Sequence, residues 1–359
     1  MMVYICGWMY FSVFLWLSSR RDRRKDKIFL IGTFFLVYFI YGMRNYDVGT
    51  DTWAYTRYFQ IYEQYSFYDL IHEKHEFKNM EYGFILLCKV VIFFTDRIDV
   101  FLRVVALVYG SLYVTFLSKL KKTEMYWYAY TYYGLYVFCT GLNIMRQGLS
   151  MLLLLYAFLE YRTKNRKWVV TTFLVLSCLF HKSALLAFIT LFPFSLMKEK
   201  ILLGKFWNWM AIFVAILGCF LFQIIFKVLG ISGYLDDIPG KMGNARFIIF
   251  IYLLVIFLIS KRGYEKNECE ISEYFFIETN MIMLLIMNFM SIYSLVFIRI
   301  TTLLLVFCAM VPCGISKCNM KSKQKCLLSI TTYIIVAIYF FHSLLGNTGG
   351  IVPFQLLQK

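Results

Sequence analysis

The stretch "MMVYICGWMYFSVFLWLSSRRDRRKDK", residues 1–27, places an apolar run directly before a basic cluster. A run of about 20 apolar residues can cross a bilayer as a helix, and cytoplasmic loops collect lysine and arginine. Here the charges follow the run, and no small-residue cleavage site is present. The stretch therefore predicts an uncleaved first span with its N-terminus extracytoplasmic.

Similar apolar runs continue along the rest of the chain. Of the 359 residues, 60% are apolar and 16% are charged, whereas an ordinary soluble domain carries about 25% charged residues. The sequence predicts an all-α, polytopic integral membrane protein with about 12 to 13 membrane helices. We find no repeat of fixed period, so residues 1–359 are expected to form a single transmembrane domain. The expected spans lie at about 3–17, 28–43, 82–95, 100–117, 125–140, 142–160, 167–180, 183–197, 206–226, 246–260, 271–290, 292–312 and 327–345.

The basic residues orient the spans. The net charge of +16 is distributed over short clusters between apolar runs, as expected for cytoplasmic loops. These loops are too short to build a nucleic-acid-binding module, so no nucleic-acid partner is expected. The clusters lie at 18–27, 161–168, 198–205, 261–266 and 317–325. Counting spans from them predicts extracytoplasmic loops at 44–80 and 227–245.

One basic segment does not fit this count. Residues 118–124, "SKLKKTE", should be cytoplasmic because two spans connect them to the basic cluster at 161–168. Yet two expected spans, 82–95 and 100–117, separate them from the outer loop at 44–80, and two crossings would place them on the outer side. Either one of these two expected spans is re-entrant or interfacial, or the basic segment is an exception to the rule. The run 82–95 is short and contains Lys89, so it is the segment in question.

Polar groups near the end of one apolar run are candidates for binding an anion. In "GLNIMRQGLSM" (141–151), Asn143, Arg146 and Gln147 are spaced i, i+3, i+4 and would share a face of one helix. A guanidinium offers paired donors in fixed geometry, which suits a phosphate or pyrophosphate. The alternative is an arginine that extends to the lipid headgroups.

Three further residues interrupt or open apolar runs on the expected outer face. His181 lies at a turn between two spans, where it is a candidate for proton transfer or for donating to a phosphate; a structural histidine is the alternative. Arg299 lies inside an apolar run, where an arginine is costly without an anion or a polar cavity. Arg246 opens another span and could instead be an interfacial anchor.

The segment "MRNYDVGTDTWAYTRYF" (43–59) breaks the second run abruptly. Gly49 is typical of a turn, and Asp51 or Thr52 is expected to be the N-cap of an amphipathic helix at the interface. Capping alone would explain Asp51, but it does not explain Arg44. Glu81, before "YGFILLCKV", adds a carboxylate near the same surface.

Taken in order, these motifs resemble the Wzy-type polysaccharide polymerases of the EpsG-like family. The matching stretches cover almost the whole chain: "YGMRNYDVGTDTWAY" (41–55), "EYGFILL" (81–87), "GLNIMRQGLSM" (141–151), "LFHKSALL" (179–186), "FIRITTLL" (297–304) and "GGIVPFQ" (349–355). Each motif is weak alone. "VPF" stands where a Pro-Tyr pair is common in the family.

The resemblance implies an enzyme of the bacterial cytoplasmic (inner) membrane, similar to integral-membrane (GT-C-like) glycosyltransferases. It would join undecaprenyl-pyrophosphate-linked oligosaccharide repeat units on the outer face, with no cofactor and no metal. Membrane lipids, a flippase and chain-length regulator proteins are the implied partners. The arginines would neutralise the pyrophosphate leaving group. The acceptor hydroxyl needs a base, for which Asp51, Glu81 and His181 are the candidates, with Asp51 slightly favoured. The binding candidates are Arg44, Asn143, Arg146, Gln147, Arg246 and Arg299.

Other classes of membrane protein are less consistent with the sequence. An O-antigen ligase usually carries its larger outer loop late in the chain, whereas the longest polar segment here is at 44–80. A flippase or other transporter predicts paired halves with matching helix breaks, which we do not find. An acyltransferase would be expected to pair histidines at a membrane face.

Overall fold

The computed structural model describes seven stretches of the chain and isolated positions between 206 and 221; the stretches are 1–19, 23–72, 80–196, 244–264, 268–292, 295–317 and 320–356. The basic cluster at 198–205 and nearly all of the expected loop at 227–245 lie outside the described residues. The chain divides into two compact units. Unit 1 contains Met1–Ala157, Thr172–Ala184 and Ser343–Lys359; unit 2 contains Phe158–Thr171 and Leu185–His342. The single domain expected from the sequence stays a prediction.

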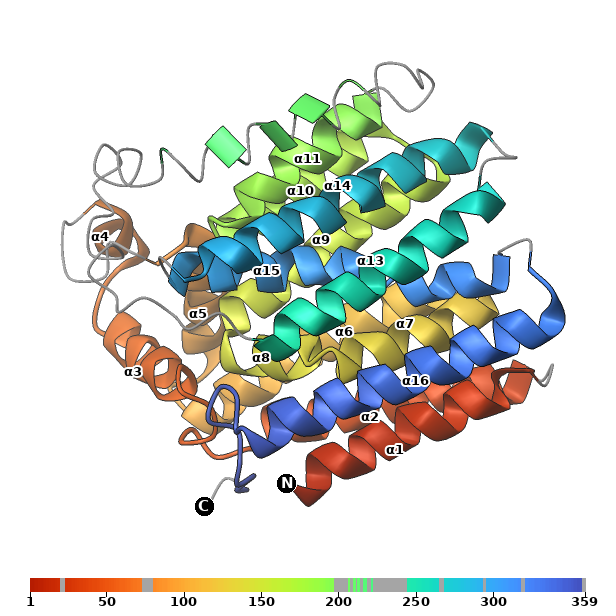
Figure 1. Ribbon diagram of the computed structural model, residues 1–359. Helices are drawn as coiled ribbons and strands as arrows, with labels where there is room; N and C mark the ends of the chain where they lie inside the picture. Colours follow the sequence, from red (N-terminus) through yellow and green to blue (C-terminus); the bar gives the residue numbers. More distant parts are fainter. Residues whose placement is uncertain are drawn as a thin grey trace. The chain divides into compact units, whose positions relative to one another are not determined.

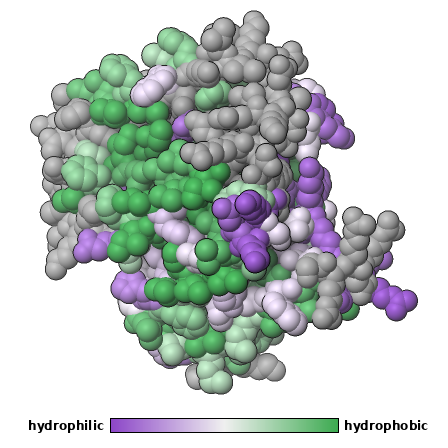
Figure 2. All heavy atoms as spheres, turned by 45° about the vertical axis from the view of Figure 1, so that its right-hand side comes forward, coloured by the Kyte–Doolittle hydropathy of each residue, from purple (hydrophilic) through white to green (hydrophobic). Residues whose placement is uncertain are grey.

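The described chain is built from helices, which confirms the prediction of an all-α polytopic membrane protein. Within the described residues, three helical stretches are long and apolar enough to cross a bilayer: Ile98–Ser118, Phe297–Ile315 and Ser322–Leu345. Several shorter apolar helices accompany them, and apolar side chains cover much of the face shown in Figure 2.

The helices of unit 1 are mostly those expected from the apolar runs, and α9 and α10 continue into unit 2. They are α1 (Met2–Trp16), α2 (Arg23–Gly42), α3 (Thr52–Glu63), α4 (Phe67–His72), α5 (Tyr82–Phe94), α6 (Ile98–Ser118), α7 (Lys122–Gly134), α8 (Val137–Asn143), α9 (Met145–Thr163) and α10 (Lys167–Phe180). The helix that the sequence predicts after Asp51 is present as α3.

Unit 2 contains the remaining helices, of which α16 ends in unit 1 and α11 begins there with Ala184. They are α11 (Ala184–Leu196), α13 (Asn244–Tyr264), α14 (Glu268–Met290), α15 (Leu295–Cys308) and α16 (Ser322–Leu345). A buried ion pair between Arg162 and Glu273, 3.0 Å apart, joins α9 to α14 within this unit.

Helices α2 and α6 pack side by side in opposite directions (Figure 1). At one end, a Cβ on Gly42 would lie 3.0 Å from the Cβ of Ala106. At the other end, Asp26 accepts a hydrogen bond from the Tyr126 hydroxyl at 2.6 Å and pairs with Lys122 at 3.3 Å. The end of α2 therefore lies beside the beginning of α6, and the beginning of α2 lies near the beginning of α7.

Tyrosines fill much of the core of unit 1. The Tyr109 and Tyr132 hydroxyls share a hydrogen bond of 2.6 Å, and the Tyr133 hydroxyl donates to the carbonyl of Tyr4 at 2.9 Å. The Tyr41 hydroxyl donates to the carbonyl of Phe138 at 3.1 Å. A tyrosine can be buried at low cost when its hydroxyl finds such a partner. This pairing explains how a helix as rich in tyrosine as α7 is buried on every side.

A sharp break separates α8 from α9 at Ile144, whose φ of −101° and ψ of 72° are not helical. The prediction that Asn143, Arg146 and Gln147 share a face of one helix is therefore wrong. Asn143 ends α8, whereas Arg146 and Gln147 belong to the first turn of α9. The corner is tight because Gly148 faces Gly141, and a Cβ on Gly148 would lie 2.8 Å from the Gly141 carbonyl oxygen.

Substituting Gly148 with alanine tests this corner. The new methyl group meets backbone that cannot move aside, and overpacking of this kind costs about 1–3 kcal/mol. We expect a lower thermal unfolding midpoint for Gly148→Ala in detergent. Ser111→Ala, on the exposed surface of α6, is the matched control and should unfold like the unmodified protein. Equal midpoints for the two variants would contradict the close approach.

Candidate functional site

Three charged or titratable side chains from distant parts of unit 1, Glu81, Arg146 and His181, meet in one cluster with Glu81 at its centre. One carboxylate oxygen of Glu81 pairs with the Arg146 guanidinium, and the other lies 3.1 Å from Nδ1 of His181. The backbone N–H of Lys182 donates to that second oxygen at 3.2 Å. The Glu81 side chain is only 6% exposed and that of Arg146 is 13% exposed. This is a compact, largely buried cluster of opposite charges.

The helix ends place these three groups. Glu81 is the extended residue just before α5, and His181 follows the last residue of α10. The start of α5 lies against the end of α10, since a Cβ on Gly83 would be 2.8 Å from the Leu179 carbonyl oxygen. Helix α9 is joined to α10 by a hydrogen bond of 2.8 Å between the Ser150 and Ser177 hydroxyls.

The charge of Glu81 follows from these contacts. Burial raises the pKa of the carboxyl, but the hydrogen bond to His181, the positive charge of Arg146 and the Lys182 N–H lower it by more. The resulting pKa is about 2, compared with 4.5 for an ordinary glutamate. Glu81 is thus ionised at neutral pH, and it accepts hydrogen bonds without donating any.

An aromatic ring from α3 covers the arginine of the cluster. The Cζ atom of Arg146 lies 5.5 Å from the centroid of the Tyr55 ring, within the range of a cation–π contact. The sequence did not single out Tyr55 for this position, because aromatic residues are also common in interfacial helices.

A second polar cluster surrounds Asn143. Its Oδ1 accepts the backbone N–H of Asp51 at 2.9 Å, and its Nδ2 donates to the Thr50 hydroxyl at 2.9 Å. Gly49 has a φ of +96°, which confirms the predicted turn, and a Cβ there would lie 2.9 Å from Asn143 Oδ1. Asp51 takes the predicted N-cap position of α3, but its side chain makes no capping hydrogen bond. Asn143 is therefore committed to holding this turn.

Residues 346–356, the C-terminal strap, pair with the same turn (Figure 1). The N–H groups of Gly49 and Thr50 donate to the carbonyls of Gly350 and Gly349, each at 3.0 Å. The Asn45 N–H donates to the Gln355 carbonyl at 2.7 Å. Three motifs that are far apart in the sequence, at 41–55, 141–151 and 349–355, thus form one structure.

Arg44 lies shortly before this turn in the chain, and its side chain is 0% exposed. Its three guanidinium nitrogens have no hydrogen-bond partner among the described residues, and its Cζ lies 5.7 Å from the ring of Tyr41. Burial lowers its pKa to about 10, while Tyr41, Tyr4 and Tyr55 act in the opposite direction. Arg44 therefore remains a cation at neutral pH, in a setting where a lone charge is costly.

The other predicted residues lie as follows. Gln147 is fully buried in the first turn of α9, one residue after Arg146. Arg246 is in the first turn of α13 and Arg299 is in α15, both half-buried and both in unit 2. The structure thus brings together Glu81, Arg146 and His181. Among the described residues, no group of three histidine, cysteine or acidic side chains has the arrangement of a metal site.

The fold and this cluster define a class of protein: a polytopic helical membrane protein with a buried arrangement of charges at its helix ends. The chain belongs to the EpsG family, whose family model matches residues 27–356. The matched range includes all the residues of both clusters. Membership supports a polysaccharide polymerase of the glycosyltransferase type in general terms. No curated protein and no solved structure matches the chain.

We expect the ionised Glu81 carboxylate to stabilise the fold by an amount that depends on pH. A carboxyl whose pKa falls from 4.5 to about 2 on folding contributes about 3 kcal/mol. That contribution is present above pH 4.5 and is lost as the pH falls towards 2. We expect the thermal midpoint in detergent to drop between pH 4.5 and pH 3 in the unmodified protein.

The Glu81→Gln variant should have a lower midpoint at pH 7, because Arg146 stays buried without its counter-charge, and a flatter pH profile. Glu63→Gln, at an exposed position on α3, serves as the control. If Glu81→Gln and Glu63→Gln have the same midpoint at pH 7, Glu81 does not hold the cluster together.

The pairing of the C-terminal strap can be tested at Gly349, whose φ is +84°. An alanine there is strained, and its Cβ would lie 3.3 Å from Asn143 Nδ2. We expect Gly349→Ala to speed hydrogen exchange of the Gly49 and Thr50 amides. Gly346→Ala should leave exchange unchanged, since Gly346 does not have a positive φ. Equal exchange in both variants would show that the strap does not protect these amides.

Proposed function

We propose that the protein is a polysaccharide polymerase that joins undecaprenyl-pyrophosphate-linked oligosaccharide repeat units by en bloc glycosyl transfer. Family membership supports the polymerase activity in general. The observation that carries the finer proposal is the buried Glu81–Arg146–His181 cluster, with the cation Arg44 in the same unit. A pyrophosphate leaving group needs positive charge, and glycosyl transfer to a hydroxyl needs a base.

The proposed reaction forms one glycosidic bond and breaks one. A hydroxyl oxygen at the non-reducing end of the acceptor repeat unit attacks the anomeric carbon of the donor glycan. The bond between that carbon and the pyrophosphate oxygen breaks, and undecaprenyl pyrophosphate leaves with the electron pair. The hydroxyl proton passes to a base of the enzyme.

The geometry favours His181 as that base. An ionised Glu81 can only accept, so it orients the histidine ring with the proton on Nδ1 and leaves Nε2 basic. Glu81 is a poor base itself, because its pKa of about 2 leaves little affinity for a proton. We therefore assign Glu81 as the positioning residue. Asp51, which the sequence analysis favoured, remains the competing candidate.

The arginines would balance the charge of the leaving group. Glu81 and Arg146 form a pair of opposite charges, and Arg44 is a further buried cation in the same unit. Protonation of His181 during the reaction would add positive charge at the moment when the departing pyrophosphate gains negative charge. We propose that this arrangement makes the enzyme independent of metals. Gln147, Arg246 and Arg299 remain proposed contacts to pyrophosphate or glycan, whereas Asn143 acts by holding the turn at 49–51.

The location is also part of the proposal. Positive charge in the loops supports an outer-face site in the bacterial cytoplasmic membrane, with the N-terminus extracytoplasmic. A flippase that delivers repeat units and a protein that regulates chain length are the proposed partners.

His181→Ala tests the catalytic assignment without breaking the Glu81–Arg146 pair. Loss of a general base typically costs about 10²–10⁴-fold in rate, so polymer ladders should disappear and lipid-linked single repeat units should accumulate. Arg97→Ala, which removes an exposed pair with Asp99, is the control and should make polymer of normal length. Each variant must be present in the membrane in equal amount.

The comparison with Asp51→Asn separates the two candidate bases. Normal ladders from His181→Ala together with lost ladders from Asp51→Asn would assign the base to Asp51. Normal ladders from Arg146→Ala would remove the role of that arginine at the pyrophosphate. A deletion strain that accumulates no lipid-linked repeat units on the outer face would indicate a flippase instead.

A further inference from the structure

The antiparallel packing of α2 and α6 constrains the path of the chain between them. The last residue of α2, Gly42, lies against the first turns of α6 at Arg103 and Ala106. At the opposite ends, Asp26 of α2 meets Lys122 and Tyr126 of α7, which begins four residues after α6 ends. Because α2 and α6 run side by side, residues 43 and 97 lie on the same side of any membrane that both helices cross.

A chain that leaves and returns on one side crosses the membrane an even number of times in between. Among the described residues between Gly42 and Ile98, the apolar helix is α5. Helix α3 carries charged residues along its exposed face, and α4 has only six residues. Residues 73–79, which lie outside the described stretches, are too few to cross, since about 20 are required. A single crossing by α5 is therefore incompatible with the packing of α2 and α6.

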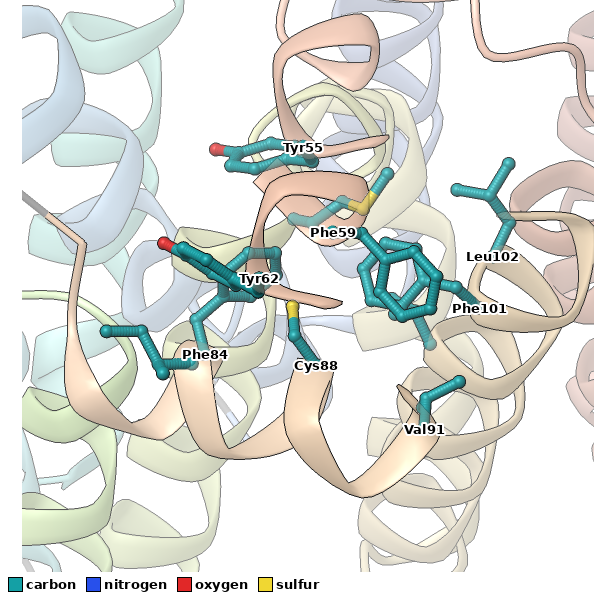
Figure 3. Packing of buried hydrophobic residues seen from close by; sticks show 11 residues of the cluster. Tyr55, Phe59, Tyr62, Phe84, Cys88, Val91, Phe101 and Leu102 are labelled. Atoms are coloured by element: carbon teal, nitrogen blue, oxygen red, sulfur yellow. The ribbon is translucent and has the colours of Figure 1, made fainter. Parts of the chain in front are cut away.

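The contacts of α5 attach it to α3 and α6. Its inner face packs onto α3 and α6 in one buried cluster, in which Phe84 and Cys88 meet Tyr55, Tyr62 and Phe101 (Figure 3). The ammonium group of Lys89, midway along α5, donates to the carbonyls of Tyr62 and Tyr65 at the end of α3. Lys89, the charged residue within the apolar run 82–95, is therefore paired with carbonyl groups at the C-terminal end of α3, where a cation is favourable.

The outer face of α5 is apolar and uncovered. The exposed side chains follow a helical spacing of about four residues; they are Tyr82, Leu86, Val90, Phe93 and Phe94. Phe93 is 83% exposed and Phe94 is 79% exposed. Phenylalanine at this exposure beside a membrane-spanning bundle indicates contact with lipid.

We infer that α5 is an interfacial helix that does not cross the membrane and whose apolar face contacts the acyl chains of one leaflet. This leaflet is the one at which α2 ends. Thirteen residues give a helix about 20 Å long, shorter than the ~30 Å hydrocarbon core. The inference does not depend on the proposed function. It also removes the conflict over 118–124, which now share the side of the other basic loops without an exception.

Cysteine labelling with a membrane-impermeant maleimide tests the sidedness. Single cysteines replace Ser66, Asp96 and Lys121, all exposed, in a variant whose ten native cysteines are changed to serine. Each must first label in detergent. We expect Ser66→Cys and Asp96→Cys to label from the same side of intact cells, and Lys121→Cys from the other. Labelling of Ser66→Cys and Asp96→Cys from opposite sides would show that α5 crosses and would overturn the inference.

Contact with acyl chains is tested separately by nitroxide labels on the two faces of this surface region. At Leu86→Cys and Val90→Cys, relaxation by dissolved oxygen should exceed relaxation by a water-soluble nickel complex. The order should reverse at Gln60→Cys, on the exposed polar face of α3. Stronger relaxation by nickel at Leu86 and Val90 would place α5 in water and contradict the lipid contact.

Discussion

The ion pair between Glu81 and Arg146 is the contact on which the arrangement of unit 1 depends most. It joins the start of α5 to the start of α9, and the second oxygen of the same carboxylate joins both to the end of α10. Buried charges of this kind are stable only as a set, because removing one member leaves another without compensation. The carboxylate therefore fixes the relative positions of three helix ends. Glu81 therefore sets the positions of Arg146 and His181, and with them the geometry of any reaction in which these two residues take part.

The polar clusters lie at helix ends, where the backbone is irregular and its polar groups need partners outside a helix. Within a bilayer, backbone groups must be satisfied inside helices, and irregular chain is tolerated only where protein or water satisfies it. The backbone N–H groups of the Gly49–Asp51 turn find their acceptors at one end of the helices. These acceptors are the side chain of Asn143, at the end of α8, and carbonyl groups of the C-terminal strap. The cluster at Glu81 lies nearby through the short step from Asn143 to Arg146. Of the candidate site residues, Glu81 and His181 lie in irregular segments at helix ends, just before α5 and just after α10.

Much of the architecture could be predicted from local sequence. The apolar runs located the helices, and the turn at Gly49 with Asp51 at the N-cap position located α3, because these signals act over a few residues. The partnership of Glu81 with His181, 100 residues later, has no local signal, although each was identified as a candidate. The i, i+3, i+4 spacing at 143–147 was misleading because tight packing of Gly141 on Gly148 breaks the helix at Ile144. The path of 82–95 was ambiguous in sequence and required the packing of α2 against α6.

The C-terminal strap has a consequence for how the protein is made. Amides at 45–50 find their acceptors at 349–355, about 300 residues later in the chain, and closing such a distant contact is slow compared with forming a helix. During synthesis, α1 to α10 can be inserted and packed while this turn still lacks its partner. The turn at Gly49–Asp51 is therefore completed only after residues 349–355 have been made. Until residues 349–355 have been made, the amides of this turn lack their acceptors, so this region of unit 1 matures only after the helices α1 to α16 have been synthesised.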